Sequence, residues 1–118
     1  MTEYQNIAQR YIDSWNETDD AKRRLLVDEL YTEDAAFTDP LADITGPEAI
    51  DQLMAGAQGQ FAGLEFSLGP VDGHHDQARF TWFLGAPGAE PIVVGFDVIV
   101  LADQKIKRVY GFLDKVPA

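Results

Sequence analysis

The sequence predicts an α+β domain, with helices in the first half, an antiparallel sheet in the second, and the helices on one face of that sheet. Two patterns predict this class. Apolar residues recur at helical spacing through much of residues 2–61. From residue 64 onward, apolar and polar residues alternate with the period of two that a strand requires. The length of 118 residues suits a single domain, which we expect to span residues 1–118.

Three helices are expected, over residues 2–16, 19–31 and 45–61. The first carries one continuous apolar stripe with Tyr11 at its middle, so the tyrosine ring is expected to be buried and its hydroxyl to need a partner. Asp19 or Asp20 can cap the second helix. The third opens with TGPE, which places a proline in the first turn and a glutamate near the positive helix end.

Five strands are expected, over residues 35–39, 64–68, 77–84, 92–101 and 105–113. Pro40 stops the first strand. The Asp72-Gly73 pair and a tight turn near Asp103 are expected to join hairpins. The last two strands are apolar on both faces, although antiparallel sheets usually leave one face in water. We therefore expect a homodimer packed through the outer sheet face, which carries Tyr110 and Phe112.

The composition excludes several classes of function. The net charge of −11 would repel nucleic acid and anionic membranes, so neither is expected as a partner. The absence of cysteine excludes disulfides, thiolate metal sites and cysteine nucleophiles. No apolar run approaches the roughly 20 residues that span a bilayer, and no signal peptide is recognised. The expected location is the cytoplasm.

One carboxylate stands out in the apolar strand VVGFDVIVLA, residues 93–102. A charge at Asp97 is costly inside a buried strand, so it needs a partner or must keep its proton. Asp39 precedes Pro40, where an aspartate is also a common turn residue. Each of these acids alone has a structural explanation, and so has Tyr11 as a core residue.

Four segments taken together resemble the NTF2-like superfamily, and in particular its SnoaL-like and ketosteroid-isomerase-like branch. They are RYIDSWNETDD (10–20), ELYTEDAAFTDP (29–40), TGPEAI (45–50) and GFDVIVLADQKIKRV (95–109). The resemblance covers nearly the whole chain. It implies a cone, in which three N-terminal helices pack on a strongly curved antiparallel (mixed) sheet around an apolar pocket.

The resemblance also implies roles for four residues. In ketosteroid isomerases a helix-one tyrosine and a late-strand aspartic acid donate to an enolate oxygen, and another aspartate moves the proton. Matched by motif, the donors are Tyr11 and Asp97, the base is Asp39, and Tyr31 helps to position Tyr11. Apolar neighbours would raise the pKa of Asp97 and keep it protonated, so that it can donate. This chemistry needs no cofactor.

The implied pocket departs from the ketosteroid isomerases in two places. Met54 stands where another tyrosine is often found, and Leu113 where a tryptophan is often found. The other residues expected at the pocket wall are Phe66, Phe80 and Trp82.

A second segment, VDGHHDQARFTW (71–82), resembles a subset of small SnoaL-like proteins. Adjacent strand residues face opposite sides, so His74 and His75 are not expected to share a metal, and no metal site is expected. One of them could reach the pocket as an acid or base, and His75 is included in the expected site. A hairpin histidine that caps backbone or lies in solvent is the alternative, and it is favoured over a role in the pocket.

Four functions remain open from the sequence. The first is an isomerase or polyketide-cyclase-like lyase that moves a proton on an apolar carbonyl compound. The others are a non-catalytic domain that binds an apolar metabolite, epoxide opening by water, and a dimerisation module. Arg79 and Arg108 fall on the outer sheet face, which counts against epoxide opening. An enzyme predicts an open pocket in which Tyr11, Asp39 and Asp97 converge.

Overall fold

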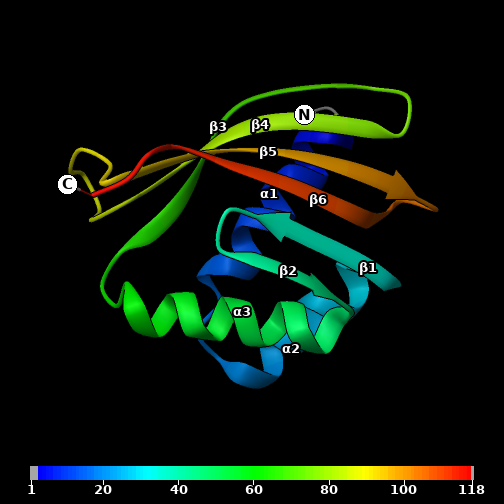
Figure 1. Cartoon of the computed structure of the whole chain (residues 1–118), viewed down its shortest axis with the longest axis horizontal. Coiled ribbons are helices and arrows are strands. Elements are labelled where there is room, and N and C mark those ends of the chain that lie inside the picture. The colour runs from blue at the N-terminus through cyan, green and yellow to red at the C-terminus, as the bar shows by residue number, and fades with distance from the viewer. Residues whose placement is uncertain (1–2, 118) are drawn as a thin grey trace.

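The protein folds as three helices packed on one face of a six-stranded mixed sheet (Figure 1). The structure is a computed structural model and describes residues 3–117. Residue 2, where the first helix was expected to begin, lies outside the described residues. The elements are α1 (Glu3–Asn16), α2 (Asp20–Leu30), β1 (Tyr31–Asp39), β2 (Ala42–Thr45), α3 (Pro47–Gln60), β3 (Glu65–His74), β4 (Gln77–Gly85), β5 (Val93–Ala102) and β6 (Lys105–Lys115). The expected α+β class is confirmed.

The strands lie in the order β2-β1-β6-β5-β4-β3. All neighbours are antiparallel except β1 and β6, which run parallel and bring the first strand beside the last. Bulges interrupt the β3–β4 and β5–β6 pairings. Bulges bend strands and increase their twist, so they account for the strong curvature of the sheet around α1 (Figure 1).

The helices occupy the inner face of this curved sheet. α1 contacts β3 and β4, α3 contacts β1 and β2, and α2 packs on α1 and α3. In β5 the buried positions alternate with half-buried ones, and Asp97 falls on the buried, helix-facing set. Arg79 and Arg108 are exposed and pair with the half-buried Val98 and Val100, so both arginines lie on the outer face as expected.

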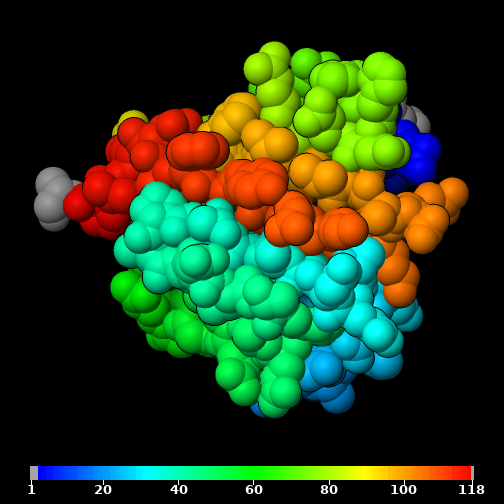
Figure 2. All heavy atoms as spheres, turned by 45° about the vertical axis from the view of Figure 1, so that its right-hand side comes forward, coloured from blue at the N-terminus to red at the C-terminus, as the bar shows by residue number. Residues whose placement is uncertain are grey.

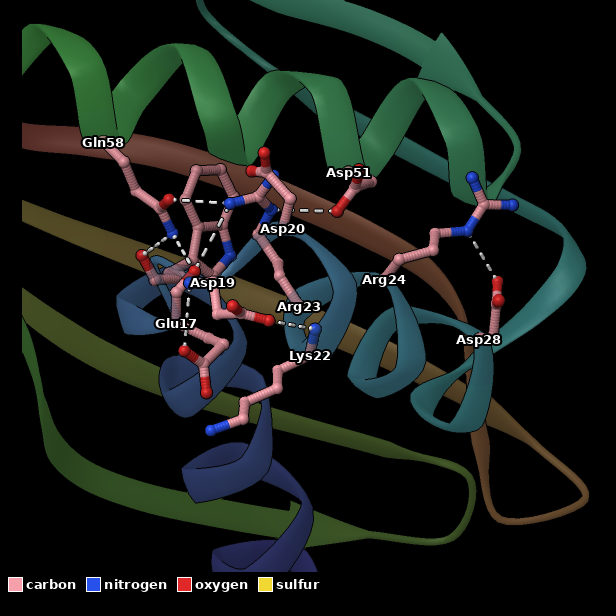
Figure 3. A network of polar contacts seen from close by, with 10 residues as sticks. Glu17, Asp19, Asp20, Lys22, Arg23, Arg24, Asp28, Asp51 and Gln58 are labelled. Carbon is pink, nitrogen blue, oxygen red and sulfur yellow. Dashed lines mark hydrogen bonds and ion pairs between the residues drawn. The ribbon is translucent and has the colours of Figure 1, made fainter.

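A buried arginine ties the three helices together (Figure 3). Arg23 of α2 is 3% exposed, and its guanidinium donates to Asp51 and Gln58 of α3 at 2.9 Å each. Gln58 in turn donates to the carbonyl oxygens of Trp15 and Glu17 at the end of α1. The network fixes α3 relative to α1.

Three differences from the expected strands change the topology or the turns. β1 begins at Tyr31 rather than at residue 35, because Tyr31 already pairs with Ile106 of β6. β2 was not expected. The turn expected at Asp72-Gly73 is wrong, since both residues pair with β4 and the hairpin turns at His75, whose φ is 51°. Glycine is required at position 73 because the ring of Tyr4 covers it.

Candidate functional site

A cavity of about 630 Å³ lies between α1, α3 and the inner face of the sheet. Its volume falls in the range of sites that bind small molecules. Tyr11, Asp39 and Asp97 all line it, and so do Phe66, Trp82 and Leu113. The remaining lining residues are Ile12, Trp15, Phe37, Leu41, Gln52, Leu53, Gly56, Ala57, Gln60, Phe61, Leu84, Val93, Val116 and Pro117. The rim is open and apolar, because Leu41 is 84% exposed and Val116 56% exposed.

Tyr11 and Asp97 form a buried hydrogen bond in this cavity. The Tyr11 hydroxyl donates to Oδ2 of Asp97 over 2.8 Å, and both residues are almost fully buried. Burial, followed by the nearby Asp97 carboxylate, raises the pKa of Tyr11 well above its ordinary value. Tyr11 is therefore a neutral donor at any working pH.

The pKa of Asp97 lies well above that of an ordinary aspartate. Burial raises the pKa of Asp97 to about 6, whereas hydrogen bonds from Tyr11 and Trp82 lower it and the nearby Asp39 raises it. The rise has the direction expected from the apolar neighbours of Asp97, and the Trp82 donor, which the sequence had not indicated, opposes it.

Asp39 reaches the same part of the cavity from β1. Its Oδ1 accepts from the backbone N–H groups of Leu41 and Ala42, at 2.8 Å each, in the turn that follows Pro40. Gly111 of β6 lies between the two acids. A Cβ at Gly111 would stand 3.0 Å from the Cβ of Asp39 and 3.0 Å from Oδ1 of Asp97.

Two buried polar atoms beside Tyr11 have no hydrogen-bond partner among the described residues, Trp15 Nε1 and the Tyr31 hydroxyl. Their rings lie 6.3 Å and 6.5 Å from the ring of Tyr11. Buried polar atoms without partners are costly and recur at functional sites. Of these two residues, only Trp15 lines the cavity, whereas Tyr31 lies in the core behind it.

The charge of the described cavity lining is entirely negative. It includes Asp39 and Asp97 but no lysine, arginine or histidine. Within residues 3–117, no group of three or more His, Asp or Glu side chains is arranged to hold a metal ion. An anionic ligand would find no counter-ion in this lining.

The other expected pocket residues fall into three groups. Phe66, Trp82 and Leu113 line the cavity. Tyr31, Met54 and Phe80 are fully buried in the core behind its surface. His75 does not reach the pocket, so its place among the expected pocket residues is wrong. It is exposed in the β3–β4 turn, as the favoured hairpin interpretation predicts, and its backbone carbonyl accepts from Tyr4.

The structure adds lining residues that the sequence had not singled out, above all Trp15, Phe37 and the α3 residues around Gly56. Trp15 could have been found, because it lies one helical turn after Tyr11 on the same stripe. Gly111 could not, because its place opposite Asp97 depends on a bulge in β6.

Comparison with known proteins decides the family. The SnoaL-like domain family matches residues 8–109. The chain belongs to the SnoaL-like family. A proposed isomerase of this family from Agrobacterium tumefaciens is 38% identical to this SnoaL-like chain, with a TM-score of 0.91 over 97% of this chain and 99% of that chain. The family and fold expected from the sequence are therefore confirmed.

More distant solved structures share the fold of this SnoaL-like domain. A proposed SnoaL-like polyketide cyclase from Jannaschia sp. is 18% identical, with a TM-score of 0.76 over 95% of this chain and 85% of that chain. A proposed ketosteroid isomerase from Kribbella flavida is also 18% identical, with a TM-score of 0.73 over 98% of this chain and 81% of that chain. No curated protein matches the chain. None of the helices in residues 3–117 is both long and apolar enough to cross a membrane.

Proposed function

We propose that this SnoaL-like protein is an enzyme that moves a proton on a neutral, apolar carbonyl compound through an enolate. The observation that carries the proposal is the convergence of Tyr11, Asp39 and Asp97 in one apolar cavity open to solvent. An isomerase or a polyketide-cyclase-like lyase would use such a site. The name of the Agrobacterium protein, a proposed isomerase, supports the first of these.

In this proposal, Asp39 is the base and Asp97 the donor to the carbonyl oxygen. Two backbone N–H bonds hold Oδ1 of Asp39 in place, which leaves its other oxygen for proton abstraction. Asp97 accepts from Tyr11 through Oδ2, so a proton on Oδ1 would face the cavity beside Asp39. Donors already in place stabilise the enolate charge as it forms.

Ligand binding supplies the proton state that Asp97 needs. An apolar ligand displaces water from the cavity, and the added desolvation favours the neutral acid. The pKa of Asp97 begins at about 6, so a modest further rise makes the protonated form predominate near pH 7.

The test is an isomerisation assay on a β,γ-unsaturated ketosteroid across pH 5–9. We expect kcat/KM of the wild type to fall above about pH 6, tenfold per pH unit, as free Asp97 loses its proton. Asp39→Asn should lower kcat/KM by about 10³-fold. The amide of Asp97→Asn is a neutral donor at every pH. The kcat/KM of this variant should be about tenfold below that of wild type at pH 5, and it should not decline at high pH.

Complete loss of activity in Asp97→Asn, with Asp39→Asn still active, would mean that Asp97 is the base and Asp39 the donor. No turnover by the wild type would favour a second candidate, a domain that binds an apolar metabolite without reaction. The hydrogen bonds of Asp39 within its own turn favour that candidate, since they also suit a purely structural acid.

We also propose a homodimer packed through the outer sheet face, and a cytoplasmic location. Tyr110 and Phe112 are 43% and 58% exposed on β6. They pair with the half-buried Val98 and Phe96 of β5, which makes one contiguous apolar area. Atoms of β5 and β6, in orange, are exposed between β1 in cyan and the β3–β4 hairpin in green (Figure 2). Exposed apolar areas of this kind mark interaction sites.

A further inference from the structure

The indole of Trp82 packs closely against the strand at Gly95. The two residues are directly opposite in the β4–β5 pairing. A Cβ at Gly95 would overlap Cζ2 and Cε2 of the indole and would stand 2.6 Å from its Nε1. The space that a side chain would fill at position 95 is therefore occupied by the nitrogen-bearing edge of Trp82.

This placement aims the indole N–H at the acid of the site. Asp97 is two residues beyond Gly95 on the same face of β5, and the nearby Trp82 side chain acts on it as a donor that lowers its pKa. Phe66 packs against the Trp82 ring with centroids 5.5 Å apart in an edge-to-face arrangement. The indole is thus held between Phe66 and the strand, with its N–H toward the carboxylate.

The backbone alone does not explain the glycine. The φ of Gly95 lies outside the left-handed region, in contrast to Gly46, Gly63 and Gly88. Another residue could adopt the same backbone, so the close approach of the Trp82 ring is what excludes a side chain.

We propose that Trp82 is a positioning residue for Asp97, and that Gly95 is the position that allows the indole to reach this carboxylate. The inference rests on the proposed catalytic role of Asp97 only where it concerns the rate of turnover. The contact itself does not depend on whether the cavity turns over a substrate.

The contact acts on an acid that has no cation beside it. Tyr11 faces Asp97 from α1, while Tyr31 and Asp39 approach it from β1. Tyr11 and Trp82 are the donors that favour the ionised form of Asp97. Loss of the indole donor should therefore favour the neutral acid.

The experiment follows the Asp97 carboxyl carbon by ¹³C NMR while the pH is changed, in wild type, Trp82→Phe, Gly95→Ala and the double variant. Trp82→Phe removes the N–H, and Gly95→Ala keeps the indole but displaces it into the cavity. We expect each single change to raise the Asp97 titration midpoint by about one pH unit. The double variant should shift no further than the larger single change, because both act through one contact.

Gly56→Ala is the matched control for Gly95→Ala. Gly56 also lines the cavity, but a Cβ there meets nothing within 4 Å. Trp15→Phe is the comparison for Trp82→Phe, since Trp15 is the other cavity tryptophan and contacts Tyr11 rather than Asp97. Gly56→Ala should leave the midpoint unchanged, and Trp15→Phe should move it less than Trp82→Phe does. If Gly95→Ala does not fold, the comparison of Trp82→Phe with Trp15→Phe decides.

An unchanged midpoint in Trp82→Phe, a fall in that midpoint, or additive shifts in the double variant would overturn the inference. The ketosteroid assay separates this result from the proposed function. A shifted midpoint without wild-type turnover would keep the contact and count against the enzyme.

Discussion

At the scale of single residues, the site depends on how Asp97 is surrounded. Its carboxyl group is buried, shares the cavity with Asp39, and is stabilised as an anion only by the Tyr11 and Trp82 donors. Two hydrogen bonds offset part of the cost of burial, which leaves a group that titrates within the working range of an enzyme. The raised pKa also has a consequence for stability.

Asp97→Asn should remove a pH dependence of stability. The pKa of Asp97 is about 6 in the folded protein and 3.8 in the unfolded chain. The folded state holds the proton more tightly, so the contribution of Asp97 to stability is fully present below pH 3.8 and is lost as the pH rises to about 6. The free energy of unfolding of Asp97→Asn, relative to that of wild type, should therefore rise by about 3 kcal/mol between pH 3.5 and pH 8.

Urea unfolding of both proteins at several pH values measures this difference. Asp103→Asn is the control, because Asp103 lies in the exposed β5–β6 turn. An equal stability difference at pH 3.5 and pH 8 would show that Asp97 titrates normally.

At the scale of elements, α3 forms one wall of the cavity and its position depends on α2. The guanidinium of Arg23 bonds to Asp51 and Gln58 of α3, and Gln58 continues to the end of α1 (Figure 3). A side chain outside the cavity lining thus ties the α3 wall to α2 and to the end of α1.

Arg23→Met should destabilise the protein by about 3 kcal/mol, because it leaves Asp51 and Gln58 without their buried partner. The neighbouring Arg24 supplies the control. Its ion pair with Asp28 lies on the helix surface, with the side chains 44% and 51% exposed. Arg24→Met should cost less than about 0.5 kcal/mol. Urea unfolding followed by tryptophan fluorescence compares the two, and similar losses would contradict a special role for Arg23.

At the scale of the whole molecule, the outer sheet face is the surface that the fold leaves uncovered. Phe112→Glu should raise the dissociation constant of the proposed homodimer by about 100-fold, since it places a charge within the apolar area. Leu25→Glu, at a residue of α2 that is 62% exposed, is the control and should leave assembly unchanged. Analytical ultracentrifugation tests both. A wild-type mass of 13.1 kDa, that of one chain, would exclude the dimer.

The charge of the molecule should select against anionic ligands. The chain carries a net charge of −11, and the described lining of the cavity contains two acids and no cation. A ketosteroid with an added carboxylate should therefore bind at least about tenfold more weakly than its carboxamide, which has nearly the same shape and no charge. Isothermal titration calorimetry measures the affinity of each ligand. Equal affinities would contradict the proposed neutral substrate.

The sequence by itself determined the fold class and indicated six residues that line the cavity, namely Tyr11, Asp39, Phe66, Trp82, Asp97 and Leu113. The helical stripe and the strand alternation are local patterns, so they predicted three helices on one face of a sheet, and the outward direction of Arg79 and Arg108. Asp97 was found because a lone acid in an apolar strand is costly wherever that strand pairs.

Only the tertiary structure decided which residues meet. The bulge in β6 shifts the register with β5, so that Gly111 rather than Tyr110 lies opposite Asp97. The parallel pairing of β1 with β6 then brings Asp39 to the same place. These pairings join residues distant in the chain, and their register depends on bulges that leave no periodic signal in the sequence. The β4–β5 pairing likewise sets Trp82 opposite Gly95 and so brings it near Asp97.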